Sequence, residues 1–172
     1  MTVLSLDISA SCTGWSLLID DKIEHGKIKT KATLTTAQRL HIFRGELARV
    51  MQIYKPKIVI IEDTFVGSNA SVVKLLAKFA GVAEQLVFEQ FKLPPVIISN
   101  KSVKAFFKVK DKKDLFNVVV DILDWNSKSS SYKDFNDVID SCAQLLYYYN
   151  EVLKTKVFRE ELDYGYKFNF NS

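Results

Sequence analysis

One five-residue segment, Ile58-Val59-Ile60-Ile61-Glu62, constrains the fold more than any other part of the sequence. Its β-branched residues would point to both faces of a strand, which is typical of a central strand covered on both sides. The segment 35–54 before it has apolar residues at helical spacing, opened by the capping-box pair Thr35 and Gln38. The segment 72–86 after it repeats the helical spacing. A strand between two helices predicts an α/β fold.

Four further segments have the pattern of strands, and the first three of the five are separated by short turns, which predicts an antiparallel meander. Helices are expected around 115–123 and from a capping pair at Ser131 and Asp134. The expected sheet is mixed, with three antiparallel strands followed by two parallel ones. The expected strands are Val3–Ile8, Gly14–Ile19, Ile23–Lys31, Ile58–Glu62 and Pro94–Ile98.

The composition supports a globular chain. Hydrophobic residues make up 48% and charged residues 26% of the 172 residues, and no linker interrupts the pattern, so a single domain over 1–172 is expected, with a tail at 155–172 of unassigned role. No apolar run reaches the roughly 18 to 20 residues that cross a bilayer, and no signal sequence is visible. Cys12 and Cys142 match neither a disulfide framework nor a zinc site, which favours reduced thiols in the cytoplasm.

Positive charge is concentrated in one segment. The net charge is only +4, yet the segment 101–113 holds six lysines against one acid, Asp111. This predicts a local basic patch that could contact phosphates, although a solvated lysine-rich loop would explain most of its members. The six lysines are Lys101, Lys104, Lys108, Lys110, Lys112 and Lys113.

Four carboxylates are expected to meet at one edge of the sheet. Asp7 and Glu62 each stand at the end of a predicted strand, and the ends of neighbouring strands form the edge at which α/β proteins bind ligands. Asp137 and Asp140 are three residues apart on the last predicted helix, so they share a face beside an apolar stripe. Any one of these acids alone would be explained as a turn residue or as part of a solvated helix face. Taken together, their order along the chain favours a common functional site.

Such a cluster needs a positive charge, because close carboxylates repel each other by several kcal/mol per pair at intermediate dielectric. Oxygen ligands without histidine or cysteine suit Mg2+ or Mn2+. Two such ions about 3.5 to 4 Å apart are a common device for phosphodiester cleavage. The pattern therefore favours metal-dependent phosphodiester chemistry.

Three motifs resemble those of the RuvC family of Holliday junction resolvases, in the ribonuclease H-like superfamily. The resemblance runs from Val3 to about Leu146. The first motif resembles the family's in its acid, its short loop, its Thr-Gly pair and its aromatic residue. The second motif resembles the family's almost throughout. The third motif is the terminal acid pair. The motifs are Asp7-Ile8-Ser9-Ala10-Ser11-Cys12-Thr13-Gly14-Trp15, Ile60-Ile61-Glu62-Asp63-Thr64-Phe65-Val66-Gly67-Ser68-Asn69-Ala70 and Asp137-Val138-Ile139-Asp140.

The resemblance implies a ribonuclease H-like sheet and a structure-selective endonuclease that resolves four-way junctions and other branched DNA such as forks. It implies that Asp7, Glu62, Asp137 and Asp140 bind two Mg2+ ions, with Mn2+ as a substitute. One ion would activate a water and the other would stabilise the leaving 3′-oxygen, which leaves 5′-phosphate and 3′-hydroxyl ends.

It further implies that Phe65 stacks on bases opened at the crossover, although a core phenylalanine would fit that position equally well. Lys112 or Lys113 resembles the family lysine near the scissile phosphate, and Lys113 aligns slightly better, so Lys113 is the expected catalytic lysine. Two opposed cuts imply a homodimer, for which the helix over 72–86 is the best candidate interface; a helix simply packed on the sheet is the alternative.

The sequence departs from the family at two places. Ile8-Ser9 stand where Pro-Gly is usual, and Ser141-Cys142 replace small alanine-like residues. With 20 lysines against 4 arginines, these departures resemble a phage-encoded branch acting in the host cytoplasm, with a relaxed cleavage-site preference. Two rival functions stay open at this point: a junction-binding protein that does not cleave, and a relative of actin-like ATP phosphotransferases, which would lack their second lobe.

Overall fold

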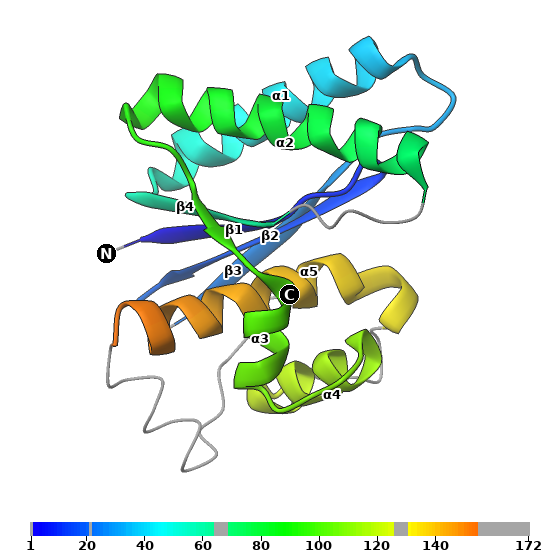
Figure 1. Cartoon of the computed structure of the whole chain (residues 1–172). Coiled ribbons are helices and arrows are strands. Elements are labelled where there is room, and N and C mark those ends of the chain that lie inside the picture. Colours follow the sequence, from blue (N-terminus) through cyan, green and yellow to red (C-terminus); the bar gives the residue numbers. More distant parts are fainter. Residues whose placement is uncertain (1, 21, 64–68, 126–130, 155–172) are drawn as a thin grey trace.

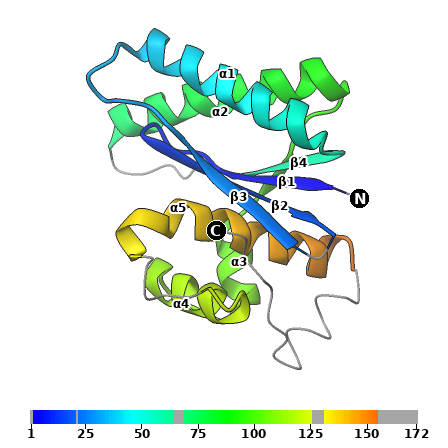
Figure 2. The same cartoon turned by 180° about the vertical axis from the view of Figure 1, so that it is seen from behind.

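The computed structural model describes residues 2–20, 22–63, 69–125 and 131–154. A five-stranded sheet lies between two helical layers, with α1 and α2 on one face and α3, α4 and α5 on the other (Figure 1). The view from behind shows the same three layers (Figure 2). The strands are β1 (Val3–Asp7), β2 (Cys12–Ile19), β3 (Lys22–Lys29), β4 (Ile58–Glu62) and β5 (Val96–Ile98). The helices are α1 (Thr36–Tyr54), α2 (Ala70–Phe91), α3 (Asn100–Phe106), α4 (Lys112–Ile122), α5 (Tyr132–Tyr147) and a π-helical turn, Tyr148–Val152.

The strand order is β3-β2-β1-β4-β5, which confirms the predicted mixed sheet. β1, β2 and β3 pair antiparallel, whereas β4 pairs parallel to both β1 and β5. β1 and β4 are therefore adjacent, as the helical connection between them suggested. The fifth strand is shorter than expected because the two prolines before it, Pro94 and Pro95, have no backbone N–H to donate.

The ends of α1 follow the predicted signals. The Thr35 side chain accepts from the backbone N–H of Gln38, and the Gln38 side chain accepts from the Thr35 N–H, which completes the capping box. At the other end Lys55 adopts a left-handed conformation (φ 46°), and its N–H donates to the Met51 carbonyl. Pro56 then prevents the helix from continuing.

The lysine-rich segment contains more regular structure than the sequence indicated. It forms α3, a short connection and the first turn of α4, in which the Asp111 side chain accepts from the Asp114 N–H. Only Val103 of α3 is fully buried, so the segment lacks the strong apolar period from which a helix can be predicted. No helix in the described part of the chain is long and apolar enough to cross a membrane.

Candidate active site

The register of β1 and β4 brings two of the predicted acids together. Leu6 pairs with Ile61 in the parallel ladder, so the next residue on each strand, Asp7 and Glu62, stands at the same edge of the sheet. The side chains of β1 point alternately to the two faces of the sheet. Leu4 and Leu6 belong to the core under α1 and α2, so Asp7 is directed to the α5 side. The sequence prediction that these two carboxylates share an edge is thus consistent with the strand order.

The third and fourth acids reach this edge because α5 lies very close to β2. Gly14, opposite Asp7 in the β1–β2 ladder, faces the backbone of Asp137: an added Cβ would lie 2.1 Å from the Asp137 carbonyl oxygen. Only a residue without a side chain allows this approach. Val138 and Cys142 of α5 are fully buried against the sheet, so the predicted apolar stripe fixes the orientation of the acid pair.

Asp7 lies in an unfavourable electrostatic environment. Burial raises the pKa of the Asp7 carboxyl well above its ordinary value, and the negative charges of Asp140, Glu62 and Asp137 raise it further, whereas Lys112 lowers it. Each of these interactions requires proximity, because Coulomb energies between groups separated by water are small. The four predicted carboxylates are therefore electrostatically connected, with Asp7 the most strongly affected.

Lys112 supplies positive charge to the cluster. Its Nζ lies 2.8 Å from Asp140 Oδ2, and the Asp140 side chain is 5% exposed while that of Lys112 is 46% exposed. Burial raises the pKa of Asp140, and Lys112 opposes that rise. Its neighbour Lys113, the lysine preferred from the sequence, is exposed and forms no ion pair with a described residue.

Two amide side chains hold Glu62, and the sequence reasoning did not identify either of them. Asn100 Nδ2 donates to Glu62 Oε1 at 2.8 Å, and Gln144 Nε2 donates to Glu62 Oε2 at 3.2 Å. Gln144 is 2% exposed and comes from α5, four residues after Asp140. The available signal was a polar residue inside the apolar run 142–146, one helical turn from an acid.

Asp137 is more exposed than Asp140 and lies beside Cys12. Burial raises the pKa of the Cys12 thiol to about 11, and its hydrogen bond with Asp137 adds to this rise. The loop before Cys12 is closed by Ser9, whose side chain accepts from the Cys12 N–H at 3.1 Å and donates to the Cys12 carbonyl oxygen at 2.9 Å. Ser9 thus fixes the path of the loop whose sequence departs from the family.

The second departure, Ser141-Cys142, also fits its surroundings. Both residues are fully buried, and the Ser141 hydroxyl donates to the Val138 carbonyl oxygen of its own helix at 2.7 Å. A serine that satisfies its hydroxyl in this way occupies little more volume than alanine. Cys12 and Cys142 are both free thiols.

The site is chemically suited to a hard divalent cation. Its donors are carboxylate oxygens, which repel one another and therefore need a positive charge. The side chains as they lie do not form a ligand set, however, because no group of three or more His, Cys, Asp or Glu in the described residues is arranged to hold a metal ion. Asp140 is paired with Lys112, and Glu62 with two amides. Lys112 thus already supplies Asp140 with a positive charge.

The predicted DNA-binding residues are distributed around this edge unevenly. Lys104 is half-buried on α3, and the remaining lysines of the patch are exposed. Phe65, predicted to stack on bases, belongs to the segment 64–68, which lies outside the described residues. The exposed lysines are Lys101, Lys108, Lys110, Lys112 and Lys113.

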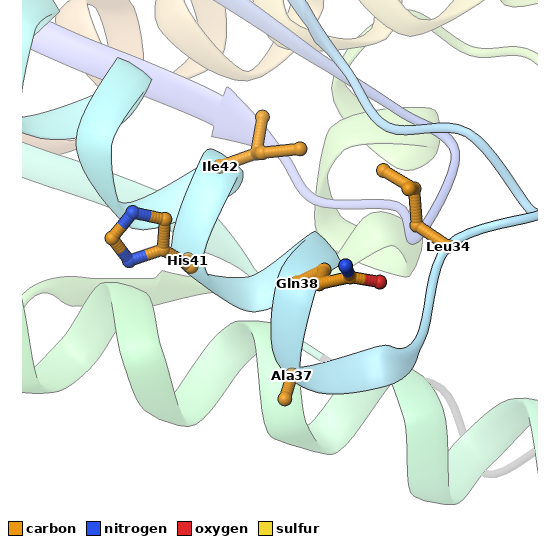
Figure 3. Close-up of a pocket in the computed structure, with 5 residues that line it drawn as sticks. All are labelled: Leu34, Ala37, Gln38, His41 and Ile42. Atoms are coloured by element: carbon orange, nitrogen blue, oxygen red, sulfur yellow. The ribbon is translucent and has the colours of Figure 1, made fainter.

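An open hollow of about 370 Å³ lies elsewhere on the molecule and contains none of the predicted site residues. It is formed by the first turns of α1 and the residue Leu34 before that helix (Figure 3). Its lining is mainly apolar, with His41 and Gln38 as polar members. The carboxylate edge of the sheet is therefore the better candidate for chemistry.

A mixed sheet in the order β3-β2-β1-β4-β5, with acids at the ends of β1 and β4 and on a helix packed against them, is the ribonuclease H-like architecture. The family model described as crossover junction endodeoxyribonuclease RuvC matches residues 4–139. The chain belongs to the RuvC family.

Similar proteins bear the same family name. The crossover junction endodeoxyribonuclease RuvC of Sphingopyxis alaskensis is 38% identical over 87 residues, which are 48% of this chain and 56% of that relative. That of Fusobacterium nucleatum is 30% identical over 87 residues, 48% of this chain and 46% of the relative. The chain thus spans about half the length of the curated relatives it matches.

Solved structures agree in fold. The T. thermophilus RuvC in complex with a Holliday junction substrate matches with a TM-score of 0.71 and 15% identity, covering 88% of this chain and 96% of that one. The yeast mitochondrial Holliday junction resolvase Ydc2 matches with a TM-score of 0.63 and 13% identity, covering 93% and 83%. At these identities the likeness establishes the fold.

Proposed function

We propose that this protein is a metal-dependent endonuclease that resolves four-way DNA junctions and also cuts other branched DNA such as forks. The observation that carries the proposal is the placement of Asp7, Glu62 and Asp140 at one edge of a ribonuclease H-like sheet, electrostatically coupled and accompanied by Lys112. Membership of the RuvC family, and junction resolvases among the proteins of the same fold, support the choice of substrate.

Nucleases of this family depend on a divalent metal. We assign Asp7, Glu62, Asp137 and Asp140 as the residues that would hold it, and Mg2+ as the ion, with two ions per subunit and Mn2+ as a substitute. When bound, such ions supply an activated water and stabilisation of the leaving 3′-oxygen, giving 5′-phosphate and 3′-hydroxyl ends. The chain's own contribution would be to hold these four carboxylates at one edge, with Asp7 and Asp140 buried.

Lys112 has a separate role in this proposal. Its Nζ is within reach of the buried carboxylates and half of its side chain is exposed, so it can pass from Asp140 to a phosphate of the substrate. Lys113 was favoured by alignment with the family motif, and it stays a candidate for the same phosphate. Adjacent residues on a helix point about 100° apart, so only one of the two can face the carboxylates at a time.

The remaining lysines of the patch and Phe65 complete the proposed DNA contacts. Lys101, Lys104, Lys108 and Lys110 would neutralise phosphates on either side of the cut, and Phe65 would stack on an opened base. The salt dependence of binding tests the phosphate contacts: the slope of log K against log salt should be near 0.9 per phosphate contacted. Lys113→Ala should lower that slope or the cleavage rate.

A four-way junction has near two-fold symmetry, and two opposed cuts are best made by two copies of the same site. We therefore propose a homodimer, with α2 as the interface helix. Its inner face packs on the sheet, while Val72 and Phe88 on its outer side are 51% and 53% exposed. The high lysine content suggests a phage-encoded enzyme that acts in the host cytoplasm.

The decisive test is incubation with a synthetic immobile four-way junction, a forked duplex and a linear duplex, each with and without Mg2+. We expect cleavage of the junction and a slower cleavage of the fork, both dependent on the metal, with the linear duplex left intact. Asp7→Asn and Glu62→Gln should abolish cleavage and preserve junction binding. Binding without cleavage by the unaltered protein would replace the nuclease proposal with a junction-binding one, and unchanged cutting by both variants would refute the site assignment.

A further inference from the structure

The two oxygens of the Glu62 carboxylate are each held by a side-chain amide from a different helix. Asn100 Nδ2, at the start of α3, donates to Oε1 at 2.8 Å. Gln144 Nε2, in the buried middle of α5, donates to Oε2 at 3.2 Å. Hydrogen bonds to both oxygens fix the rotation of the carboxylate plane as well as its position, which a single donor cannot do.

A third residue bonds the other end of the Gln144 amide. Ser5, fully buried on β1, donates its hydroxyl to Gln144 Oε1 at 3.4 Å. An ionised Glu62 carboxylate can only accept, so Nε2 is the end of the amide that faces it, and Oε1 is left to accept from Ser5. The reversed amide would place an oxygen against the carboxylate and leave the Ser5 hydroxyl without this acceptor. β1, β4, α3 and α5 are thereby joined through four side chains.

Packing alone does not account for Gln144. Its neighbours on α5, Cys142, Ala143, Leu145 and Leu146, are fully buried and apolar or weakly polar, so an aliphatic side chain at 144 would be the simplest solution for the core. A buried amide is tolerated where its donors and acceptors are satisfied, and here they are satisfied by Glu62 and Ser5.

We propose that Asn100 and Gln144, with Ser5 orienting Gln144, are positioning residues that hold Glu62 in the orientation needed at the metal-binding edge of the sheet. Each amide occupies one lone pair of its carboxylate oxygen, and the remaining lone pairs of Glu62 stay available. This inference rests on the proposed function, because it assigns Glu62 a ligand role.

The test measures Mn2+ binding to the full-length protein without DNA, by titration calorimetry and by electron paramagnetic resonance of free Mn2+. Gln144→Met keeps the side-chain length and removes both hydrogen bonds, and we expect it to weaken Mn2+ binding 10- to 100-fold. Asn100→Ala removes the other donor without adding a charge, and it should weaken Mn2+ binding in the same direction.

Asn150→Leu is the matched control. Asn150 is also a fully buried amide near the end of the same helical segment, but its Nδ2 donates to the Leu146 carbonyl oxygen. We expect Asn150→Leu to bind Mn2+ as the unaltered protein does, even if its melting temperature changes. An equal loss of Mn2+ binding in this variant would assign the effect of Gln144→Met to general loosening of α5.

A double-mutant cycle separates positioning from a purely structural role. If Gln144 acts through Glu62, Gln144→Met should cause no further loss of Mn2+ affinity in a Glu62→Gln background. An additive loss would overturn the proposal. If the unaltered protein neither binds Mn2+ nor cleaves junctions, the proposed function fails. The positioning of Glu62 is then judged by the same double-mutant cycle measured in thermal unfolding. Absence of coupling between positions 62 and 144 in that cycle would refute the positioning role.

Discussion

The two faces of the sheet differ in what they bury. The face under α1 and α2 carries a large apolar cluster that includes Leu4 and Leu6 of β1. The opposite face, under α5, also has an apolar cluster, but the same strand contributes the buried polar residues Ser5 and Asp7 to it. Because successive residues of a strand point to opposite faces, one five-residue strand supplies both environments.

The difference shows where stability and chemistry are separated in this fold. Buried carboxylates and amides lower the gain from burial unless each is satisfied. In the described residues they lie on the α5 face, where Gln144 donates to Glu62 and Lys112 pairs with Asp140. The other face gains stability from apolar packing around its centre. Substitutions on the α1 and α2 face should therefore alter the free energy of unfolding, and those on the α5 face should alter cleavage and metal response as well.

The largest expected effect on stability comes from the apolar face. Phe43 and Phe79 are both fully buried, with ring centroids 5.1 Å apart. Phe43→Ala should lower the free energy of unfolding by about 3 to 5 kcal/mol, through lost transfer energy and the cavity that remains. Urea denaturation followed by circular dichroism measures this loss. Ile53→Ala, at an exposed position of α1, should change the free energy of unfolding by less than about 0.5 kcal/mol, and an equal loss in both variants would contradict the assigned core.

Glycine substitutions should have opposite signs on the two faces. An alanine at Gly14 would collide with the Asp137 backbone, so Gly14→Ala should lower the free energy of unfolding by roughly 1 to 3 kcal/mol and reduce cleavage by displacing α5. Gly45, inside α1, has nothing within 4 Å of an added Cβ, and Gly45→Ala should raise the free energy of unfolding by about 0.5 to 1 kcal/mol. Thermal unfolding of both variants provides the comparison; stabilisation by Gly14→Ala would disprove the close approach of α5.

Loss of the Lys112 ion pair should have a smaller effect that metal can offset. Lys112→Met should lower the free energy of unfolding by roughly 1 to 2 kcal/mol, less than for a fully buried pair because half of the lysine side chain is exposed. Added Mg2+ should restore most of this loss by binding the folded state. Lys113→Met is the control. It should change neither the free energy of unfolding nor the response of that energy to Mg2+. Equal effects at both positions would argue against a specific contact with Asp140.

The smallest effect expected is a gain in stability. Since burial and neighbouring acids raise the pKa of Asp7 in the folded state, ionisation of Asp7 destabilises the fold as pH rises above the ordinary carboxyl value. Asp7→Asn should therefore match the unaltered protein near pH 4 and melt at a higher temperature near pH 7, in the presence of a chelator. Asp121→Asn, on the exposed side of α4, should show no such pH-dependent gain. A gain in melting temperature that is largest at acidic pH would contradict the raised pKa of Asp7.

Local patterns predicted most of the elements but not α3, and the order of the strands predicted that Asp7 and Glu62 share an edge. The β-branched run 58–62 and the capping box at Thr35 are signals whose physical causes act over a few residues, and both elements begin and end where expected. The convergence of Asp7 and Glu62 followed from the adjacency of two strands. These inferences hold because strand alternation and parallel pairing leave few alternatives.

The partners within the site could not be obtained in this way. Whether Lys112 or Lys113 meets Asp140 depends on the rotation of α4 about its axis, which is set by packing and not by the lysines themselves. The amides of Asn100 and Gln144 reach Glu62 only because α3 and α5 arrive from the same side of the sheet. Contacts of this kind join residues 38 and 82 positions apart, and a single sequence contains no local signal for them.

The close contact between Gly14 and the Asp137 backbone has a consequence during synthesis of the protein. Asp137 and Asp140 belong to α5, the last long helix among the described residues, so a ribosome that has translated only the first four strands has made Asp7 and Glu62 without these two acids. A chain truncated before α5 would have Asp7 and Glu62 on a sheet whose second face lacks this helix. Under the proposed function, such fragments would be unable to nick the DNA around them.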